Sequence, residues 1–235
     1  MGKVYAGTSG WAYTSWRPKF YPAKLPSAKF LGYYATRLNS VEVNYTFRAV
    51  VTRQMLAGWM EAVPSDFRFA IKAPQLITHI LRLRGTRRAT TAFLASLKPL
   101  HKAGKLGPVL FQLPPNFKCD LARLDNFLEG LPRGTRVAME FRHPSWFNED
   151  VYKRLRRANV ALCEAESEDL VTPETVTADF RYFRLRKEKY PPTERRVLLR
   201  KVKKAARDGD VFAYFKHEDK PDGAFYAESL LKEFS

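Results

Sequence analysis

Two glutamates that lie far apart in the sequence, Glu42 and Glu140, share the same local pattern. Apolar and other side chains alternate around each of them at the period of two that a β-strand imposes, and each glutamate falls on the face opposite the apolar residues. Two carboxyl groups brought together could serve as general acid and general base if their surroundings separate their pKa values. The alternative is a structural network of ion pairs, with the cationic partners Lys72, Arg142 and Arg184.

Four segments show this alternation, and each carries polar or charged side chains at the end of its inward face. Asn44 and Arg142 extend the inward faces of the two segments that hold the glutamates, while Lys72 and Gln112 end the inward faces of two others. Chance rarely places such groups at the same point of four strands. The pattern therefore predicts one shared polar pocket at the carboxyl ends of the strands.

A run of cations begins at the end of the predicted strand at 181–186 and continues beyond it. Arg184 and Arg186 carry planar guanidinium groups, which bind phosphate through two parallel hydrogen bonds. Lys72 could be a Schiff-base nucleophile if it were desolvated, but beside carboxylates we expect it to stay protonated and to contact an anion. The residues predict a site for a phosphate-bearing ligand. The alternative is a solvated basic loop that also includes Lys187 and Lys189.

Three residues near the predicted strand ends extend the candidate site. Ser9 lies in a short glycine-flanked turn whose backbone N–H groups could face an anion. Trp11 opens an aromatic loop that could stack on a base or a sugar, or could pack as an apolar lid. His143 could donate a proton or position a ligand, but a histidine at a strand end is more often a structural hydrogen-bond partner.

Helical patterns separate the strand patterns along the chain. Apolar residues at i, i+3 and i+4 spacing predict helices that begin near Ser27, Thr52, Asp120 and Asn148, and another over 193–207. Strands are predicted at 4–9, 40–45, 67–72, 109–113, 136–143, 160–164, 181–186 and 211–216. This alternation is typical of an α/β fold, and we expect a single TIM-type (β/α)8-barrel domain over residues 1–235. A doubly wound open sheet is the alternative.

The charge of the chain is unusual. Lys and Arg number 41 against 24 Asp and Glu, which gives a net charge of +17. Such a surplus should attract polyanions through long-range, salt-sensitive steering. A general compositional bias would produce the same number.

Several classes of protein do not fit the composition. The 2 cysteines are too few for a disulfide framework and suit a reducing cytosol. No apolar run has the length of a membrane span and the start lacks a signal-peptide core, so we expect a cytoplasmic protein without a membrane partner. With 4 histidines, no ligand-spaced motif and several cations in the predicted pocket, we expect no metal and no other cofactor.

Seven short motifs, in order along the chain, resemble those of the YecE-like family, domain of unknown function number 72. They are Gly7-Thr-Ser-Gly-Trp11, Phe20-Tyr-Pro22, Val41-Glu-Val-Asn-Tyr-Thr-Phe47, Phe69-Ala-Ile-Lys-Ala-Pro74, Phe111-Gln-Leu-Pro-Pro115, Met139-Glu-Phe-Arg-His143 and Thr177-Ala-Asp-Phe180. The resemblance implies a TIM barrel without a settled reaction. The chain departs from the family pattern where Arg186 and Lys187 replace His-Gly, and where Lys216 and His217 replace an Asn pair.

Two hypotheses of function follow. In the first, the protein is an enzyme that acts on a phosphate-bearing substrate such as a nucleic acid, nucleotide or sugar phosphate. It would be a metal-independent hydrolase, lyase or isomerase. The cations would hold the phosphate, and Glu42, Glu140 or His143 would transfer protons. In the second, it is a non-catalytic nucleic-acid-binding protein that uses its basic surface and aromatic loops. The sequence alone does not name the substrate or the oligomeric state.

Overall fold

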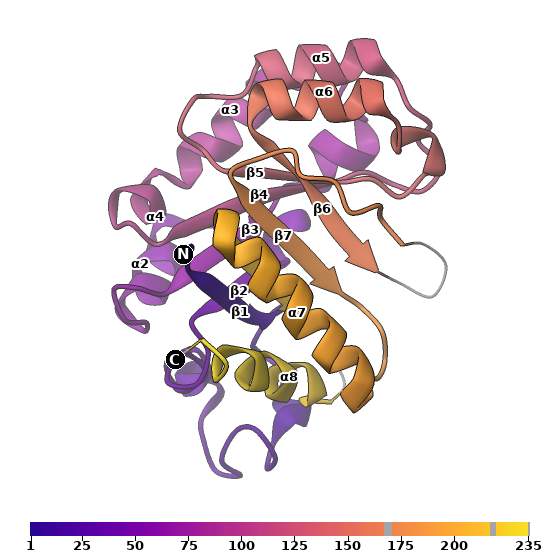
Figure 1. Ribbon diagram of the computed structural model, residues 1–235. Coiled ribbons are helices and arrows are strands. Elements are labelled where there is room, and N and C mark those ends of the chain that lie inside the picture. Colours follow the sequence, from indigo (N-terminus) through magenta and orange to yellow (C-terminus); the bar gives the residue numbers. More distant parts are fainter. Residues whose placement is uncertain (167–170, 217–219, 235) are drawn as a thin grey trace.

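The computed structural model describes residues 1–166, 171–216 and 220–234. In these residues eight parallel strands form a nearly closed barrel in the order β1-β8-β7-β6-β5-β4-β3-β2 (Figure 1). Their bounds are β1 (Val4–Thr8), β2 (Ser40–Val43), β3 (Arg68–Lys72), β4 (Leu106–Gln112), β5 (Val137–Glu140), β6 (Val160–Glu166), β7 (Phe180–Leu185) and β8 (Asp210–Phe215). The predicted TIM-type (β/α)8 barrel is confirmed.

Helices cover the outside of the barrel (Figure 1). Those in the described ranges are α1 (Phe30–Ala35), α2 (Arg53–Glu61), α3 (Arg87–Ser96), α4 (Lys98–Lys102), α5 (Leu121–Glu129), α6 (Glu149–Ala158), α7 (Pro192–Asp208) and α8 (Asp222–Leu231). None of them has the length and apolarity that crossing a bilayer requires. Short turns follow three strands: η3 (Tyr45–Phe47) after β2, the π-helical η4 (Leu76–Ile80) after β3, and η5 (Pro144–Trp146) after β5.

The predicted helix starts are mostly confirmed. The side chains of Thr52, Asp120 and Asn148 each accept a hydrogen bond from the backbone N–H three residues later, which satisfies a donor that the first turn leaves open. A helix also begins near Ser27, but the expected cap is absent. Ser27 opens the 3-10 turn η2 (Ser27–Lys29) without a side-chain capping bond, and this turn leads directly into α1 at Phe30.

Side chains of unequal size fill the inside of the barrel. Ala70, Ala138 and Ala161, on β3, β5 and β6, leave space that the rings of Tyr182 and Tyr214 occupy from β7 and β8. Inward residues of a barrel pack in layers, so small residues on some strands must be matched by large ones on others. On β3, β5 and β7, the next inward positions toward the carboxyl ends carry the charged side chains of Lys72, Glu140 and Arg184.

The barrel closes between β1 and β2 through side chains. These strands share an isolated bridge between Ser9 and Glu42 instead of a ladder. Below it, the Asn39 amide accepts from the Ala6 N–H and donates to the Val4 carbonyl, both at 2.9 Å. These two hydrogen bonds replace the missing ladder of backbone bonds at this seam.

The hydroxyl of Tyr34 bridges the seam higher up. It accepts a hydrogen bond from the Thr8 N–H at 2.8 Å and donates to the Ser40 carbonyl at 3.0 Å. The close approach requires glycine at position 7, because a Cβ there would lie 1.8 Å from the Ser40 carbonyl oxygen. The side chain of Tyr34 thus takes the place of a backbone partner.

The connection between β6 and β7 departs from the expected alternation. Residues 171–179 contain no helix in the part that the structure describes; an antiparallel bridge instead joins Val171 to Glu166. On the outer face of β6, Glu164 accepts hydrogen bonds from Arg181 and forms an ion pair with Lys201 of α7 at 2.9 Å. The helix after β7 therefore packs over this part of the sheet.

Candidate anion site at the carboxyl ends of the strands

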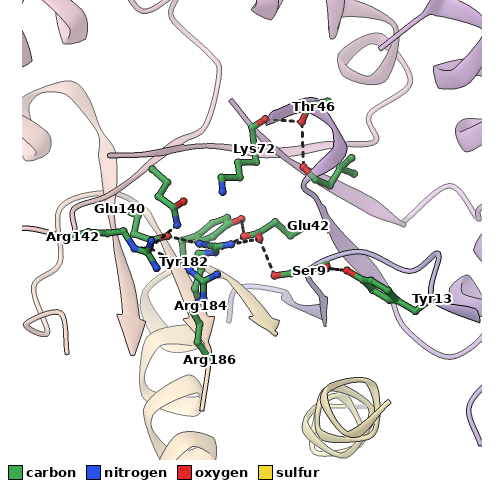
Figure 2. Close-up of polar contacts among 12 residues, drawn as sticks. Ser9, Tyr13, Glu42, Thr46, Lys72, Glu140, Arg142, Tyr182, Arg184 and Arg186 are labelled. Atoms are coloured by element: carbon green, nitrogen blue, oxygen red, sulfur yellow. Dashed lines mark hydrogen bonds and ion pairs between the residues drawn. The ribbon is translucent and has the colours of Figure 1, made fainter. Parts of the chain in front are cut away.

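Arg184, near the end of β7, joins the two glutamates. Its Nε and Nη2 donate to Oε2 and Oε1 of Glu42 at 2.9 and 2.7 Å, and its Nη1 donates to Oε2 of Glu140 at 2.6 Å (Figure 2). The side chain of Arg184 is 2% exposed, and both carboxylates are buried. Such a geometry suits the planar guanidinium fork. It favours the structural ion-pair alternative for these glutamates.

Glu42 receives two further hydrogen bonds. The Ser9 hydroxyl donates to Oε1 at 2.9 Å, and the Tyr182 hydroxyl donates to Oε2 at 2.7 Å. Burial opposes ionisation, but the charge of Arg184 and the hydrogen bonds outweigh it and lower the pKa of Glu42. Glu42 is therefore an anion at neutral pH, and all of these contacts hold Arg184 in place.

Glu140 is also held as an anion. Gln112 Nε2 donates to its Oε1 at 2.8 Å, and Arg142 Nε lies 3.3 Å from the same oxygen. Burial alone would raise its pKa, but Arg184, Arg186 and Arg142 together lower the pKa of Glu140 to about 2. A carboxyl group with this pKa has no proton to donate at neutral pH, so Glu140 does not suit the role of general acid.

Arg186 and Arg142 are less completely paired than Arg184. Nη1 of Arg186 is buried without a hydrogen-bond partner in the described residues, because its distance of 3.7 Å to Glu140 Oε1 is that of an ion pair only. The Arg186 side chain is 15% exposed and that of Arg142 is 37% exposed. Both guanidinium groups therefore lie at the rim with unused donors.

The ammonium group of Lys72 points toward Arg184 and Glu42 (Figure 2). It lies 4.2 Å from the centre of the Phe47 ring and forms no ion pair with a carboxylate in the described residues. Burial, followed by repulsion from Arg184, lowers the pKa of Lys72 to about 8. Lys72 therefore stays mostly protonated at pH 7, as expected, but its pKa lies closer to neutrality than the neighbouring carboxylates suggest, because both of them are bound to Arg184.

His79 belongs to the same rim and was missed as a site residue in the sequence. Its ring meets the Phe47 ring edge-on at 4.9 Å, and its Nδ1 lies 2.8 Å from the Thr78 hydroxyl. Burial, and then the charge of Lys72, lower the pKa of His79, so its imidazole is neutral at pH 7. The π-helical turn η4 carries it, and such turns are frequent at functional sites. Strand alternation cannot reveal a residue in this position.

Three predicted residues have more peripheral places. Trp11 packs edge-on against Trp59 of α2 at 5.5 Å. His143 Nδ1 accepts from the Ser145 N–H and lies 2.8 Å from its hydroxyl, so His143 caps η5 as a structural partner would. Asn44 follows β2, and its Oδ1 is buried without a hydrogen-bond partner in the described residues. Of the three, Asn44 alone retains an unsatisfied polar atom.

Three further basic residues follow β7 and β8. Lys187 forms an ion pair with Glu194 of α7 at 2.9 Å. Lys216 is partly buried at the end of β8, and His217 lies outside the described residues. Over the described ranges, no three His, Cys, Asp or Glu side chains gather in a way that could hold a metal ion.

Comparison with known proteins agrees with the motifs. A family profile described as "Protein of unknown function DUF72" matches residues 5–235. The chain belongs to the DUF72 family. This confirms the resemblance to YecE-like proteins. The chain is 33% identical over 145 residues to the UPF0759 protein YecE of Escherichia coli (strain K12), a match that covers 61% of this chain and 50% of that protein. It thus spans about half the length of this curated relative.

Solved structures of DUF72 members have the same fold. The crystal structure of a DUF72 family protein from Thermotoga maritima MSB8 superposes with a TM-score of 0.87 at 26% identity, over 99% of each chain. An AP endonuclease of family 2 from Brucella melitensis superposes with a TM-score of 0.56 at 11% identity, over 100% of this chain and 98% of that one. At that identity the second likeness concerns the fold alone.

Proposed function

We propose that the DUF72 chain binds a phosphate-bearing anion at the carboxyl ends of its strands, and that it acts there on a nucleotide, a sugar phosphate or a nucleic acid. The observation that carries the proposal is the charge balance of the rim. Glu42 and Glu140 are outnumbered by four cationic side chains, Lys72, Arg142, Arg184 and Arg186. Arg184 bridges both carboxylates, while Arg142 and Arg186 make only longer contacts with Glu140 and Lys72 makes no ion pair in the described residues, so the rim keeps a surplus of positive charge for a ligand.

Arg186 suits the phosphate best. Its Nη1 is buried without a hydrogen-bond partner, and desolvating an unpaired donor costs about 1–3 kcal/mol. A phosphate oxygen would supply the acceptor, and the loops after strands seven and eight of TIM barrels often hold phosphate groups. Arg142 and Lys72 would then neutralise the remaining charge. Burial at the rim strengthens each of these contacts relative to water.

Proton transfer falls to Lys72 and His79. Lys72 has a pKa of about 8 and can therefore change protonation near neutral pH. The lowered pKa of His79 keeps its imidazole neutral, so this side chain has a nitrogen that can accept a proton. Glu42 and Glu140 act through Arg184 and are positioning residues. This division supports a hydrolase, lyase or isomerase that works by acid–base chemistry on a phosphorylated substrate.

Non-catalytic binding of nucleic acid is the second candidate. The net charge of +17 favours it, because phosphate contacts dominate the affinity of proteins for nucleic acids. Base stacking has less support. Trp16 and Trp146 are fully buried and Trp11 packs on Trp59, so these rings are largely occupied by the protein itself.

Titration of the protein with inorganic phosphate, followed through backbone amide chemical shifts, tests the proposal. We expect saturable shifts at the ends of β3 and β7. Arg186→Gln should weaken binding there about tenfold through the loss of one charge-assisted contact. The matched control is Arg157→Gln on the exposed face of α6, where no ion pair is lost. Equal phosphate affinity in the two variants would count against the rim as the anion site.

A further inference from the structure

A second basic cavity lies on the outside of the barrel, between the start of α3 and the second half of α5. Its volume is about 400 Å³. Ligand pockets for small molecules usually measure about 300–1,000 Å³, so a compact ligand fits. Neither the rim site nor the proposed reaction uses this cavity.

The walls of the cavity are positively charged. Arg84, Arg87 and Arg123 line it, against a single carboxylate, Glu129, among its described lining residues. Arg123 is paired with Asp120, but neither Arg84 nor Arg87 forms an ion pair in the part of the chain that the structure describes. The two unpaired guanidinium groups therefore face this space with their hydrogen-bond donors unused.

Arg87 is placed to span the cavity. Its stem passes close to Gly130 at the end of α5, where a Cβ atom would lie 3.7 Å from Arg87 Cγ. The opposite wall contains Phe127, which is 4% exposed, so only a small part of its ring reaches the cavity. A ligand with an anionic end and an apolar or ring-shaped body would match both walls.

The amino end of α3 opens into the same cavity. This ten-residue helix begins after Thr86, which makes no side-chain capping bond to the first turn. The N–H groups of an uncapped first turn carry a partial positive charge and bind phosphate readily. The feature is general to helices, and an independent observation is needed to show that a ligand belongs there.

Thr90, one turn further along α3, provides that observation. It is 2% exposed, lines the cavity, and its hydroxyl oxygen is buried without a hydrogen-bond partner in the described residues. Buried polar atoms of native proteins nearly always have a partner, and an unpaired one calls for an explanation. A bound oxygen atom beside the helix start would accept the hydrogen of this hydroxyl.

The loop before α3 is held in one conformation around the cavity. Arg82 and Leu83 have positive φ angles of 47° and 64°, and the side chain of Leu83 is 2% exposed in the core. Non-glycine residues adopt such angles only when their surroundings impose them. The burial of Leu83 thus fixes the positions of Arg84 and the start of α3 beside the cavity, and the loop need not become ordered when a ligand binds.

We propose that this cavity is a second phosphate site, which binds the phosphate group of a small molecule. Arg84 and Arg87 donate to the phosphate oxygens together with the first-turn N–H groups of α3, and the Thr90 hydroxyl donates one more hydrogen bond. The body of the ligand lies against Phe127. The site is independent of the function proposed for the rim.

The same titration with inorganic phosphate tests this site through the amide shifts of Arg87 to Thr90, separately from those at the rim. We expect saturable shifts that weaken more than about tenfold in the Arg84→Gln/Arg87→Gln variant, because two charge-assisted contacts are lost. Arg88→Gln is the control, since Arg88 is exposed on the same helix but does not line the cavity. Its phosphate affinity should change less than about twofold.

A second variant, Thr90→Val, separates binding from folding. It removes an unpaired buried hydroxyl at nearly constant shape, so its melting temperature in phosphate-free buffer should equal or exceed that of the wild type. The rise in melting temperature on adding phosphate should be smaller than in the wild type. The proposal is overturned if the start of α3 shows no saturable shift, if the double variant binds as tightly as Arg88→Gln, or if only a polynucleotide shifts these amides.

Discussion

The guanidinium of Arg184 donates two parallel hydrogen bonds to the carboxylate of Glu42, at 2.9 and 2.7 Å, although the residues are 142 positions apart in the sequence. Both side chains are buried, and Glu140 takes the remaining nitrogen of the same group. Removal of this shared cation would leave Glu42 without an ion-pair partner in the described residues and Glu140 with only the longer contacts of Arg142 and Arg186. The rim site therefore depends on this residue for its folding as well as for its geometry.

Replacement of Arg184 should be strongly destabilising. Arg184→Met keeps much of the volume but leaves two buried carboxylates without their cation, and breaking a buried pair typically costs about 3–5 kcal/mol. Urea denaturation at pH 7 measures the loss in the free energy of unfolding. Arg157→Met, on the exposed face of α6, should change it by less than about 0.5 kcal/mol. A loss below about 1 kcal/mol for Arg184→Met would show that the network contributes little to stability.

Acid should weaken the fold through Glu140. Its pKa is lowered from 4.5 to about 2 in the folded protein, so the unfolded chain binds protons more tightly. The stabilisation is fully present above pH 4.5 and is lost as the pH falls toward 2, with a magnitude on the order of 3 kcal/mol. Glu42, whose pKa is also lowered, adds to the effect. Urea denaturation at several pH values measures the effect: between pH 6 and pH 3 the free energy of unfolding should fall less steeply for Glu140→Gln than for the wild type. Parallel curves for the two proteins would contradict this assignment.

At neutral pH Lys72 should destabilise the folded protein, whereas Glu140 stabilises it. Its folded pKa of about 8 lies below the ordinary 10.5, so folding works against the charged form and stability should rise as the pH increases from 8 to 10.5. Lys72→Met should therefore be more stable than the wild type at pH 7 by about 1–3 kcal/mol, a difference that shrinks toward pH 10.5. Lys24→Met, at an exposed position, provides the control. A destabilised Lys72→Met at pH 7 is the result that would refute the prediction.

The affinity of the rim for phosphate should also depend on the protonation of Lys72. When the pH rises through 8, Lys72 loses its proton and phosphate affinity should fall. Lys72→Arg keeps its charge at this pH and should show a flatter profile, whereas Lys72→Met should bind weakly throughout. Calorimetric titration with inorganic phosphate at several pH values measures these profiles. Identical pH profiles in the wild type and Lys72→Arg would remove Lys72 from the site.

The seam between β1 and β2 offers a test of the fold itself. Asn39→Ala removes both hydrogen bonds that its amide makes to β1 and leaves the Ala6 N–H without its acceptor. We expect a loss of about 2–3 kcal/mol, because each unsatisfied buried group costs about 1–3 kcal/mol. Asn126→Ala on α5, whose amide makes an exposed hydrogen bond to Ala122, should cost much less. Equal losses in the two variants would show that the Asn39 bridge does not close the barrel.

The sequence predicted the convergence of the site well because it depends on strand geometry. The period of two places Glu42, Gln112 and Glu140 inside, and parallel strands in a barrel bring their carboxyl ends to one rim. The choice of ion-pair partners among these side chains could not be predicted in the same way. Nothing in the spacing shows that Arg184 takes both carboxylates, and this sharing leaves the pKa of Lys72 closer to neutrality than expected.

Residues outside the strands were harder to place. His79 enters the rim because the π-helical turn η4 and the Phe47 ring orient it, and neither leaves a periodic signal in the sequence. Trp11 lies on the expected loop, but its ring packs against Trp59 of α2. This contact depends on how the helix packs against the barrel. The connection between β6 and β7 is different, because its local sequence does disfavour a helix: residues 171–179 contain Pro173 and several β-branched side chains.

Because side chains join β1 to β2, a point mutation can change how firmly these two strands are held together. Around the other joints, peptide groups hold neighbouring strands together, and exchanging a side chain leaves those links intact. Here one amide and one phenol do that work, directly beneath the end of β2 that carries Glu42. Single substitutions at this seam can therefore loosen or stiffen the wall next to the rim site one residue at a time, without rebuilding the sheet.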